Sequence, residues 1–239
     1  RRCRNKKARR SYKLRLSDWD ILSSYTLLNS TSLALFRYYK KGIAEAGCDE
    51  AGRGCLAGPV FAAAVILPTD AELPLLNDSK KLTPANRYAL RDEIREVAVD
   101  YGVAWVENEE IDKLNIFKAS MVAMHRALEK LRNAPEHLLI DGKYFYPYRD
   151  IPYQCIVEGD GKYLSVAAAS VLAKTFRDDY MIRLSQNHPE YGWDRNKGYA
   201  TAAHRAALKE YGITPYHRKS FKLLPDARQL ELKNFRDQD

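Results

Sequence analysis

Apolar residues become regularly spaced from about residue 43 onward, and their spacing predicts alternating strands and helices. Two apolar runs, 43–48 and 60–67, have the length of buried strands and are separated by glycine-containing turns. Thr83 followed by Pro84 predicts the start of a helix, because Thr caps a helix N-terminus and Pro is tolerated in the first turn. Behind it, apolar residues occur at helical spacing: Leu90, Ile94 and Val97.

The second half of the chain continues this alternation. We expect strands at 103–106, 137–140 and 154–157, helices at 109–131 and 164–185, and then shorter helices. The run Ala167-Ala168-Ala169-Ser170 carries only small side chains, which permits close packing of the last long helix. The order of the elements predicts an α/β fold.

The basic charge is concentrated in two places. Of 239 residues, 46% are hydrophobic and 29% charged, which is ordinary for a globular protein. Residues 1–40 contain 11 Lys or Arg against two acidic residues, whereas the remainder contains 28 basic and 29 acidic residues, so the net charge of +8 comes from the N-terminal part. A local basic patch follows in residues 195–222, formed by Arg195, Lys197, Arg205, Lys209, Arg218, Lys219 and Lys222 against Glu210 alone.

The cysteines and the apolar runs bear on the compartment. Cys3, Cys48, Cys55 and Cys155 show no CxxC spacing and are typical of reduced intracellular thiols. The longest apolar runs are too short to span a bilayer, and the basic N-terminus is not followed by a signal-peptide core. We therefore expect a cytoplasmic protein that does not associate with membranes.

Acidic residues stand where the predicted strands end. Asp49 and Glu50 follow the first strand, Asp141 follows the strand at 137–140, and Asp160 follows the strand at 154–157. Any one of them alone is more typical of a helix cap or a solvated side chain. Together, carboxylates at neighbouring strand ends can converge, and a hard divalent cation such as Mg²⁺ or Mn²⁺ removes their mutual repulsion. Two such ions can clamp the oxygens of a phosphodiester displacement.

Four segments, in order, resemble the motifs of bacterial ribonuclease HII, over roughly residues 43–222. They are residues 48–60 (CDEAGRGCLAGPV), residues 77–82 (NDSKKL), Gly159-Asp160 with residues 165–174 (SVAAASVLAK), and residues 197–201 (KGYAT) with His204 and residues 217–221 (HRKSF).

This resemblance implies a ribonuclease H-like fold, a central mixed sheet flanked by helices, with a small helical C-terminal part. It implies hydrolysis of the RNA strand of RNA–DNA hybrids, including cleavage 5′ of single ribonucleotides in duplex DNA. It also implies that divalent metal ions are ligated by Asp49, Glu50, Asp141 and Asp160. Asp178 and Asp179 compete for the fourth carboxylate, but their place inside a helix, next to Arg177, indicates helix-surface or ion-pair residues.

Substrate contacts are expected around Gly52-Arg53-Gly54, whose glycines suit close backbone approach to a sugar-phosphate. Given the resemblance, this segment is the expected reader of the 2′-hydroxyl, and Tyr199 the ring that stacks on the neighbouring sugar. Alone, GRG is usually a turn and a tyrosine usually core. Lys80 or Lys81 and the 195–222 patch would hold phosphates.

We divide the chain into a basic, partly disordered extension (1–40), a catalytic core (41–190) and a helical substrate-binding segment (191–239), and we expect a monomer. Residues 229–235 loosely resemble sliding-clamp-binding peptides, although the end of an amphipathic helix explains them better.

Two other interpretations compete with ribonuclease HII. Ribonuclease HIII resembles it in the core but carries a substantial extra N-terminal domain, for which the first forty residues look too short. A non-catalytic RNA–DNA hybrid-binding protein would gain nothing from four carboxylates that face phosphates.

Overall fold

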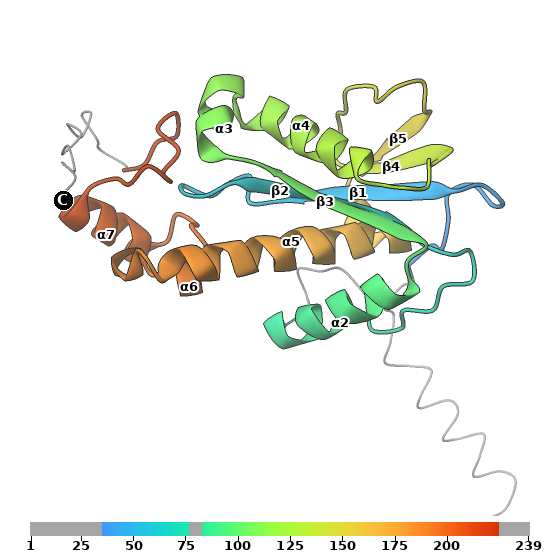
Figure 1. The fold of residues 1–239 in the computed structure, drawn as a ribbon, viewed down its shortest axis with the longest axis horizontal. Helices are drawn as coiled ribbons and strands as arrows, with labels where there is room; N and C mark the ends of the chain where they lie inside the picture. The colour runs from blue at the N-terminus through green and yellow to red at the C-terminus, as the bar shows by residue number, and fades with distance from the viewer. Residues whose placement is uncertain (1–34, 77–82, 225–239) are drawn as a thin grey trace, which may run out of the picture. The chain divides into compact units, whose positions relative to one another are not determined.

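The computed structural model describes residues 35–76 and 83–224, and in them a five-stranded mixed sheet (Figure 1). The strand order is β3-β2-β1-β4-β5. Strand β1 pairs antiparallel with β2 and parallel with β4, so the sheet changes from antiparallel to parallel at its centre. The strands are β1 (Glu45–Ala51), β2 (Val60–Ile66), β3 (Asp100–Val106), β4 (His137–Asp141) and β5 (Tyr153–Ile156). The predicted α/β class with a central mixed sheet is therefore confirmed.

Two strands are longer than the apolar pattern predicts. Strand β1 does not end at Cys48, because Asp49 and Glu50 still pair with Ala63 and Ala62 of β2. Both carboxylates therefore lie in the strand and do not follow it. Strand β3 begins at Asp100 because β2 offers it pairing partners as far as Ile66.

The helices follow the prediction, except at residue 115. They are α2 (Pro84–Val97), α3 (Asn108–Leu114), α4 (Ile116–Glu129), α5 (Leu164–Ser185), α6 (Trp193–Asn196) and α7 (Ala202–Tyr211), with short 3-10 turns η1 (Gly159–Gly161) and η2 (Pro189–Tyr191). Thr83 caps α2 as predicted, since its hydroxyl accepts from the Asn86 N–H. The single helix expected at 109–131 is wrong: Asn115 has a φ of 66°, and its side chain caps a new helix by accepting from the Lys118 N–H. Asn favours both the left-handed region and the N-cap.

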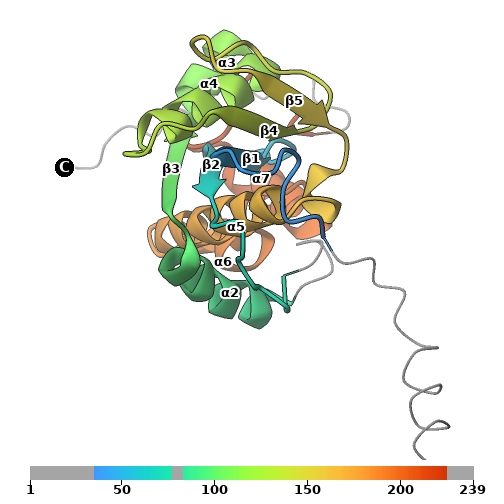
Figure 2. The same cartoon turned by 90° about the vertical axis from the view of Figure 1, so that its right-hand side faces the viewer.

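Helices cover both faces of the sheet (Figures 1 and 2). On one face, Met121 and Met124 of α4 and Ile111 of α3 pack on alternate residues of the central strands. On the other, α2 and the apolar and small side chains of α5 complete a second buried cluster. No helix in the described ranges is both long enough and apolar enough to cross a membrane.

Helix α5 lies unusually close to β1. A Cβ atom added at Gly47 would lie 2.3 Å from the carbonyl carbon of Ser165, so only glycine permits this approach. The small residues Ala167, Ala168 and Ala169 are fully buried along the same helix. The predicted close packing is confirmed, and it brings the middle of α5 next to the end of β1.

The C-terminal elements form a third buried cluster, centred on Trp193, Tyr191 and Leu208. Residues 55–57 join this cluster to the sheet through two isolated antiparallel β-bridges. One pairs the backbone of Cys55 with that of Tyr199, and the other pairs Ala57 with His217. The segment that follows β1 is therefore held between two C-terminal loops.

Candidate active site

The four carboxylates come from three elements at one edge of the sheet. Asp49 and Glu50 are near the end of β1, and Asp141 is the last residue of β4, whose Ile140 pairs with Cys48. Since β1 and β4 are parallel, their carboxyl ends lie at the same edge. Asp160 lies in η1, before α5, and is 2% exposed.

A serine, a lysine and a backbone amide hold three of these carboxylates, by hydrogen bonds and one ion pair. The Gly159 N–H donates to Oδ1 of Asp141 at 2.7 Å. Lys174 Nζ donates to Ser170 Oγ at 2.8 Å and lies 3.9 Å from Oδ2 of Asp160. The side chain of Ser170 in turn hydrogen-bonds Asp49. Ser170 and Lys174 on α5 thus link Asp49 to Asp160, a role that the sequence analysis did not assign to them.

Burial and neighbouring negative charge raise the pKa of Asp49 and of Glu50. Burial raises the pKa of Asp49 well above its usual range, and the charges of Glu50 and Asp141 raise it further, while Ser170 and Lys174 oppose the shift. Burial also raises the pKa of Glu50, against the opposing charge of Arg53, whose Nη1 lies 3.0 Å from Oε1 of Glu50. Clustered carboxylates of this kind are stabilised by added positive charge.

The donor set suits a hard divalent cation. Mg²⁺ and Mn²⁺ prefer carboxylate oxygens, which are the atoms that gather here. In the described residues, no three His, Cys, Asp or Glu side chains as placed surround a common point closely enough to hold an ion. Arg53 and Lys174 lie against the carboxylates instead. The fit therefore rests on the chemistry of the oxygens and on their mutual repulsion.

The predicted substrate-reading segment directly follows the carboxylates. Gly52 is buried with a φ of +93°, whereas Arg53 and Gly54 are exposed. A Cβ atom at Gly54 would have nothing within 4 Å. Only Gly52 is therefore required by packing, and Gly54 leaves an open backbone surface.

Tyr199 lies beside this segment. Its backbone forms an antiparallel β-bridge with that of Cys55, and the Leu56 N–H donates to the carbonyl of Gly198 at 2.8 Å. The tyrosine is 48% exposed, while its hydroxyl reaches the buried Cys55 thiol. A half-exposed ring whose hydroxyl is hydrogen-bonded is suited to stacking.

Two buried arginines hold these segments together. Arg177 donates to the carbonyls of Pro59, Ala57 and Lys197 at 3.0, 3.2 and 2.8 Å. Arg218 donates to the carbonyls of Gly58 and Arg53, each at 2.9 Å. Arg218 is fully buried, so its inclusion in a phosphate-binding surface patch is wrong. Charge counting along the chain cannot separate an arginine that binds backbone carbonyls from one that faces solvent.

The remaining candidates lie elsewhere. Asp179 accepts from the Tyr88 hydroxyl at 2.7 Å and from Arg91 at 2.6 Å, which confirms the predicted ion-pair role for that residue. Asp178 is half-buried on α5. Lys80 and Lys81 lie outside the described residues.

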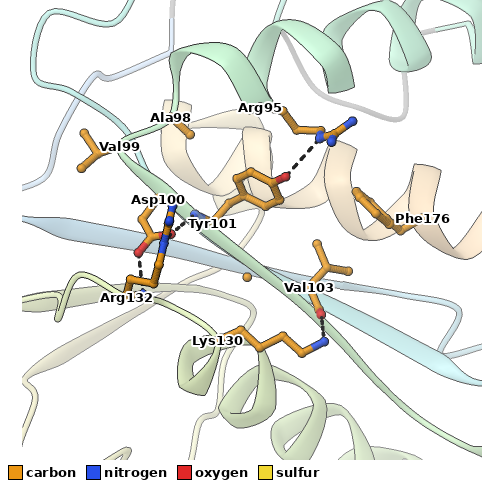
Figure 3. A pocket seen from close by; sticks show the side chains of 10 residues that line it. Arg95, Ala98, Val99, Asp100, Tyr101, Val103, Lys130, Arg132 and Phe176 are labelled. Carbon is orange, nitrogen blue, oxygen red and sulfur yellow. Dashed lines mark hydrogen bonds and ion pairs between the residues drawn. The ribbon is translucent and has the colours of Figure 1, made fainter.

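An open pocket along edge strand β3 contains none of the four carboxylates (Figure 3). Arg95 donates to the Tyr101 hydroxyl, and Lys130 to the carbonyl of Val103, which covers part of the strand's outer edge. Asp100 there accepts from the backbone N–H groups of Arg132 and Asn133. These groups are satisfied within the fold, so we place the chemistry at the ends of β1 and β4.

A mixed sheet with helices on both faces and carboxylates at adjacent strand ends defines a ribonuclease H-like, metal-dependent nuclease. Residues 46–224 match the Ribonuclease HII family. The chain is 61% identical over 192 residues to the Ribonuclease HII of Parabacteroides distasonis. This match covers 80% of this chain and 96% of that relative. It is 59% identical over 194 residues to that of Bacteroides thetaiotaomicron, with 81% and 97% covered.

Solved structures agree with this assignment. The ribonuclease H2 of Pyrococcus horikoshii superimposes with a TM-score of 0.65 at 27% identity. The match covers 76% of this chain and 95% of that chain. The RNase HII in a PCNA complex from Archaeoglobus fulgidus has a TM-score of 0.62 at 29% identity, with 78% and 98% covered.

The chain belongs to the ribonuclease HII family. It is an endoribonuclease that hydrolyses the RNA strand of RNA–DNA hybrids with divalent metal ions. This family assignment excludes the two competing interpretations, ribonuclease HIII and a non-catalytic hybrid-binding protein.

Proposed function

We propose that Asp49, Glu50, Asp141 and Asp160 hold the divalent ions, Mg²⁺ or Mn²⁺, at which the RNA strand is cut. The observation that carries this is that Ser170 and Lys174 join Asp49 to Asp160 by hydrogen bonds and a 3.9 Å ion pair, while the Gly159 N–H, next to Asp160 in the chain, holds Asp141. Bound at these oxygens, two ions would supply an activated water and stabilisation of the departing 3′ oxygen. The products would be 5′-phosphate and 3′-hydroxyl ends.

The protein's own groups orient the carboxylates. The Gly159 amide fixes one oxygen of Asp141, and Ser170 holds Asp49 on the face of β1 that packs against α5. Arg53 pairs with Glu50, and its backbone carbonyl is held by Arg218. Arg53 thus connects the acidic cluster to the segment that meets the sugar-phosphate backbone.

We propose further that Gly52-Arg53-Gly54 and Tyr199 read a single ribonucleotide. The open backbone at Gly54 suits hydrogen bonding to a 2′-hydroxyl, and the exposed ring of Tyr199 suits stacking on the adjoining sugar. Recognition of one ribonucleotide followed by DNA would place the cut on its 5′ side. The enzyme would then act on duplex DNA with embedded ribonucleotides as well as on extended hybrids.

Carboxylate removal tests the catalytic part. Asp49→Asn and Asp141→Asn are expected to abolish cleavage in Mg²⁺ or Mn²⁺ while leaving hybrid affinity in a gel-shift or anisotropy assay largely intact. Asp179→Asn, which removes an acid in the ion pair with Arg91, is the matched control and should still cleave. Full activity of either active-site variant, or of the wild type in excess chelator, contradicts the assignment.

A sliding-clamp contact through residues 229–235 is a second proposal. The Archaeoglobus fulgidus protein is an RNase HII seen in complex with PCNA, and that similarity supports a clamp partner here. Residues 229–235 lie outside the described residues. Leu232→Ala should abolish binding to the clamp of the same organism in a pull-down with purified proteins, and unchanged binding would assign residues 229–235 to another role.

Sedimentation of the full chain tests the expected monomer.

A further inference from the structure

A buried chain of polar side chains leads from Thr214 to the loop that carries Tyr199. His204, His217 and Trp193 are each fully buried. Nε2 of His204 lies 3.1 Å from Nε2 of His217 and 3.1 Å from Nε1 of Trp193. Nδ1 of His204 lies 2.9 Å from the carbonyl oxygen of Tyr199.

Two obligate donors fix which ring nitrogens carry protons. The indole N–H of Trp193 can only donate, so Nε2 of His204 accepts and carries no proton. The backbone N–H of Thr214, 2.9 Å from Nδ1 of His217, can also only donate, so His217 carries its proton on Nε2. That proton is directed at Nε2 of His204.

His204 therefore carries its proton on Nδ1 and donates it to the carbonyl of Tyr199. Both histidines are neutral, since burial lowers the pKa of each and brings that of His217 to about 3. The Trp193 N–H and the His217 Nε2–H share the single lone pair of His204 Nε2, and this is the arrangement of hydrogens in which no two protons of the pair face each other.

The carbonyl of Tyr199 is held where the substrate-reading surface is assembled. On one side the loop is bonded to residues 55 and 56, and Arg177 binds the carbonyl of Lys197. On the other side, Nδ1 of His204 contacts the carbonyl of Tyr199, whose ring is half-exposed. The same carbonyl also accepts from the N–H of Thr201, the N-cap of α7, at 2.8 Å. Without the His204 contact, the carbonyl of Tyr199 keeps this bond and loses its second hydrogen bond, the one that ties it to the buried side-chain network.

We propose that His204 is a positioning residue for substrate reading: its Nδ1–H, set by Trp193 and by His217 with Thr214, fixes the main chain of Tyr199 so that the ring meets the sugar beside the ribonucleotide in one orientation. This rests on the proposed stacking role of Tyr199. His204 does not touch the substrate and acts through Tyr199.

The tautomers are directly measurable in the unaltered protein. ¹⁵N NMR of the histidine-labelled full chain should show His204 protonated at Nδ1 only and His217 protonated at Nε2 only, both neutral at pH 7. The opposite tautomer at His204, or a charged His204 at pH 7, overturns the proposal. This measurement does not depend on whether any variant folds.

Two amide substitutions separate positioning from packing. The amide of His204→Asn can occupy the place of Nδ1 and still donate to Tyr199, whereas the amide of His204→Gln reaches the place of Nε2. We expect His204→Gln to lower the ratio of kcat/KM on a single-ribonucleotide duplex to that on an all-RNA hybrid by about three- to tenfold, the effect of one hydrogen bond. His204→Asn should keep the ratio within about twofold of wild type. Equal ratios for the two folded variants overturn the positioning role.

Tyr199→Ala, measured in parallel, distinguishes the two levels of the proposal. If Tyr199→Ala lowers the ratio and His204→Gln does not, the stacking role stands and the positioning role fails. If Tyr199→Ala leaves the ratio unchanged, the proposed stacking role fails, and the substrate-reading role of His204 fails with it.

Discussion

A Cβ atom at position 52 would lie 2.0 Å from Nε of Arg177. Gly52 is the first residue of the substrate-reading segment, and Arg177 binds three backbone carbonyls around it. One backbone position thus couples the end of β1 to the loop of Tyr199. The glycine is required by both the contact and its φ of +93°.

Gly52→Ala should therefore destabilise the protein. Strain at positive φ and overpacking each cost roughly 1–3 kcal/mol. We expect the free energy of unfolding by denaturant to fall by an amount of this order. Cleavage should also be reduced, because Arg177 must move. Gly54→Ala, whose Cβ meets nothing within 4 Å, is the control and should keep wild-type stability. Equal stability of Gly52→Ala and wild type would contradict this account of Arg177.

Lys174→Met should shift the pH dependence of cleavage. The Lys174 charge lowers the pKa of Asp49 against the effects of burial and of the neighbouring acids. Its removal raises that pKa, so the acid limb of kcat/KM against pH should move to higher pH at saturating Mg²⁺. Lys130→Met, on the β3 edge, should leave the limb in place. An unmoved limb in Lys174→Met would show that Asp49 does not sense this lysine.

The buried histidines predict loss of stability in acid. An unfolded histidine titrates near pH 6.5, whereas burial, with His204 and His188 nearby, lowers the folded pKa of His217 to about 3. Between these values the unfolded state binds more protons, so the His217 contribution to stability falls as pH falls from about 6.5 to about 3. His217→Asn removes this titration, and its unfolding free energy, measured in chelator, should depend less on pH in that window. An identical pH dependence would mean that His217 is not held neutral.

Tyr199→Ala should impair the single-ribonucleotide substrate most. Loss of a stacking contact worth about 1–3 kcal/mol corresponds to a rate loss of roughly 5- to 150-fold. The loss on an all-RNA hybrid should be smaller. Tyr211→Ala, a half-exposed tyrosine at the end of α7, is the control and should change neither rate. Equal losses on both substrates would argue against junction reading.

Sequence patterns predicted most of the fold because burial periodicity is local. The helix at 164–185 matches α5, and the strand at 60–67 ends within one residue of β2. The end of β1 was missed because Asp49 and Glu50 owe their strand conformation to pairing with β2, which their polarity hides. The break at Asn115 was missed because a single Asn interrupts an otherwise helical pattern.

The candidate site could be proposed from the sequence where its residues stand in motifs of a known family. The carboxylates and the GRG segment stand in recognisable motifs, whereas their support does not. Ser170 and Lys174 act through an i,i+4 relationship on α5. His204 acts through the carbonyl of Tyr199 and is oriented by Trp193 of α6, so these roles appear only in three dimensions. Arg218 was assigned to the surface because nothing in its neighbourhood along the chain indicates burial.

The central claim is that this carboxylate site cuts at a single ribonucleotide by metal-dependent hydrolysis. The most direct measurement maps the ends produced from a duplex with one embedded ribonucleotide, in Mg²⁺, in Mn²⁺ and in chelator. The account predicts one cut on the 5′ side of the ribonucleotide, with a 3′-hydroxyl upstream and a 5′-phosphate on the fragment that retains the ribonucleotide, and none in chelator. A cut on the 3′ side, or cleavage that persists in chelator, would contradict it.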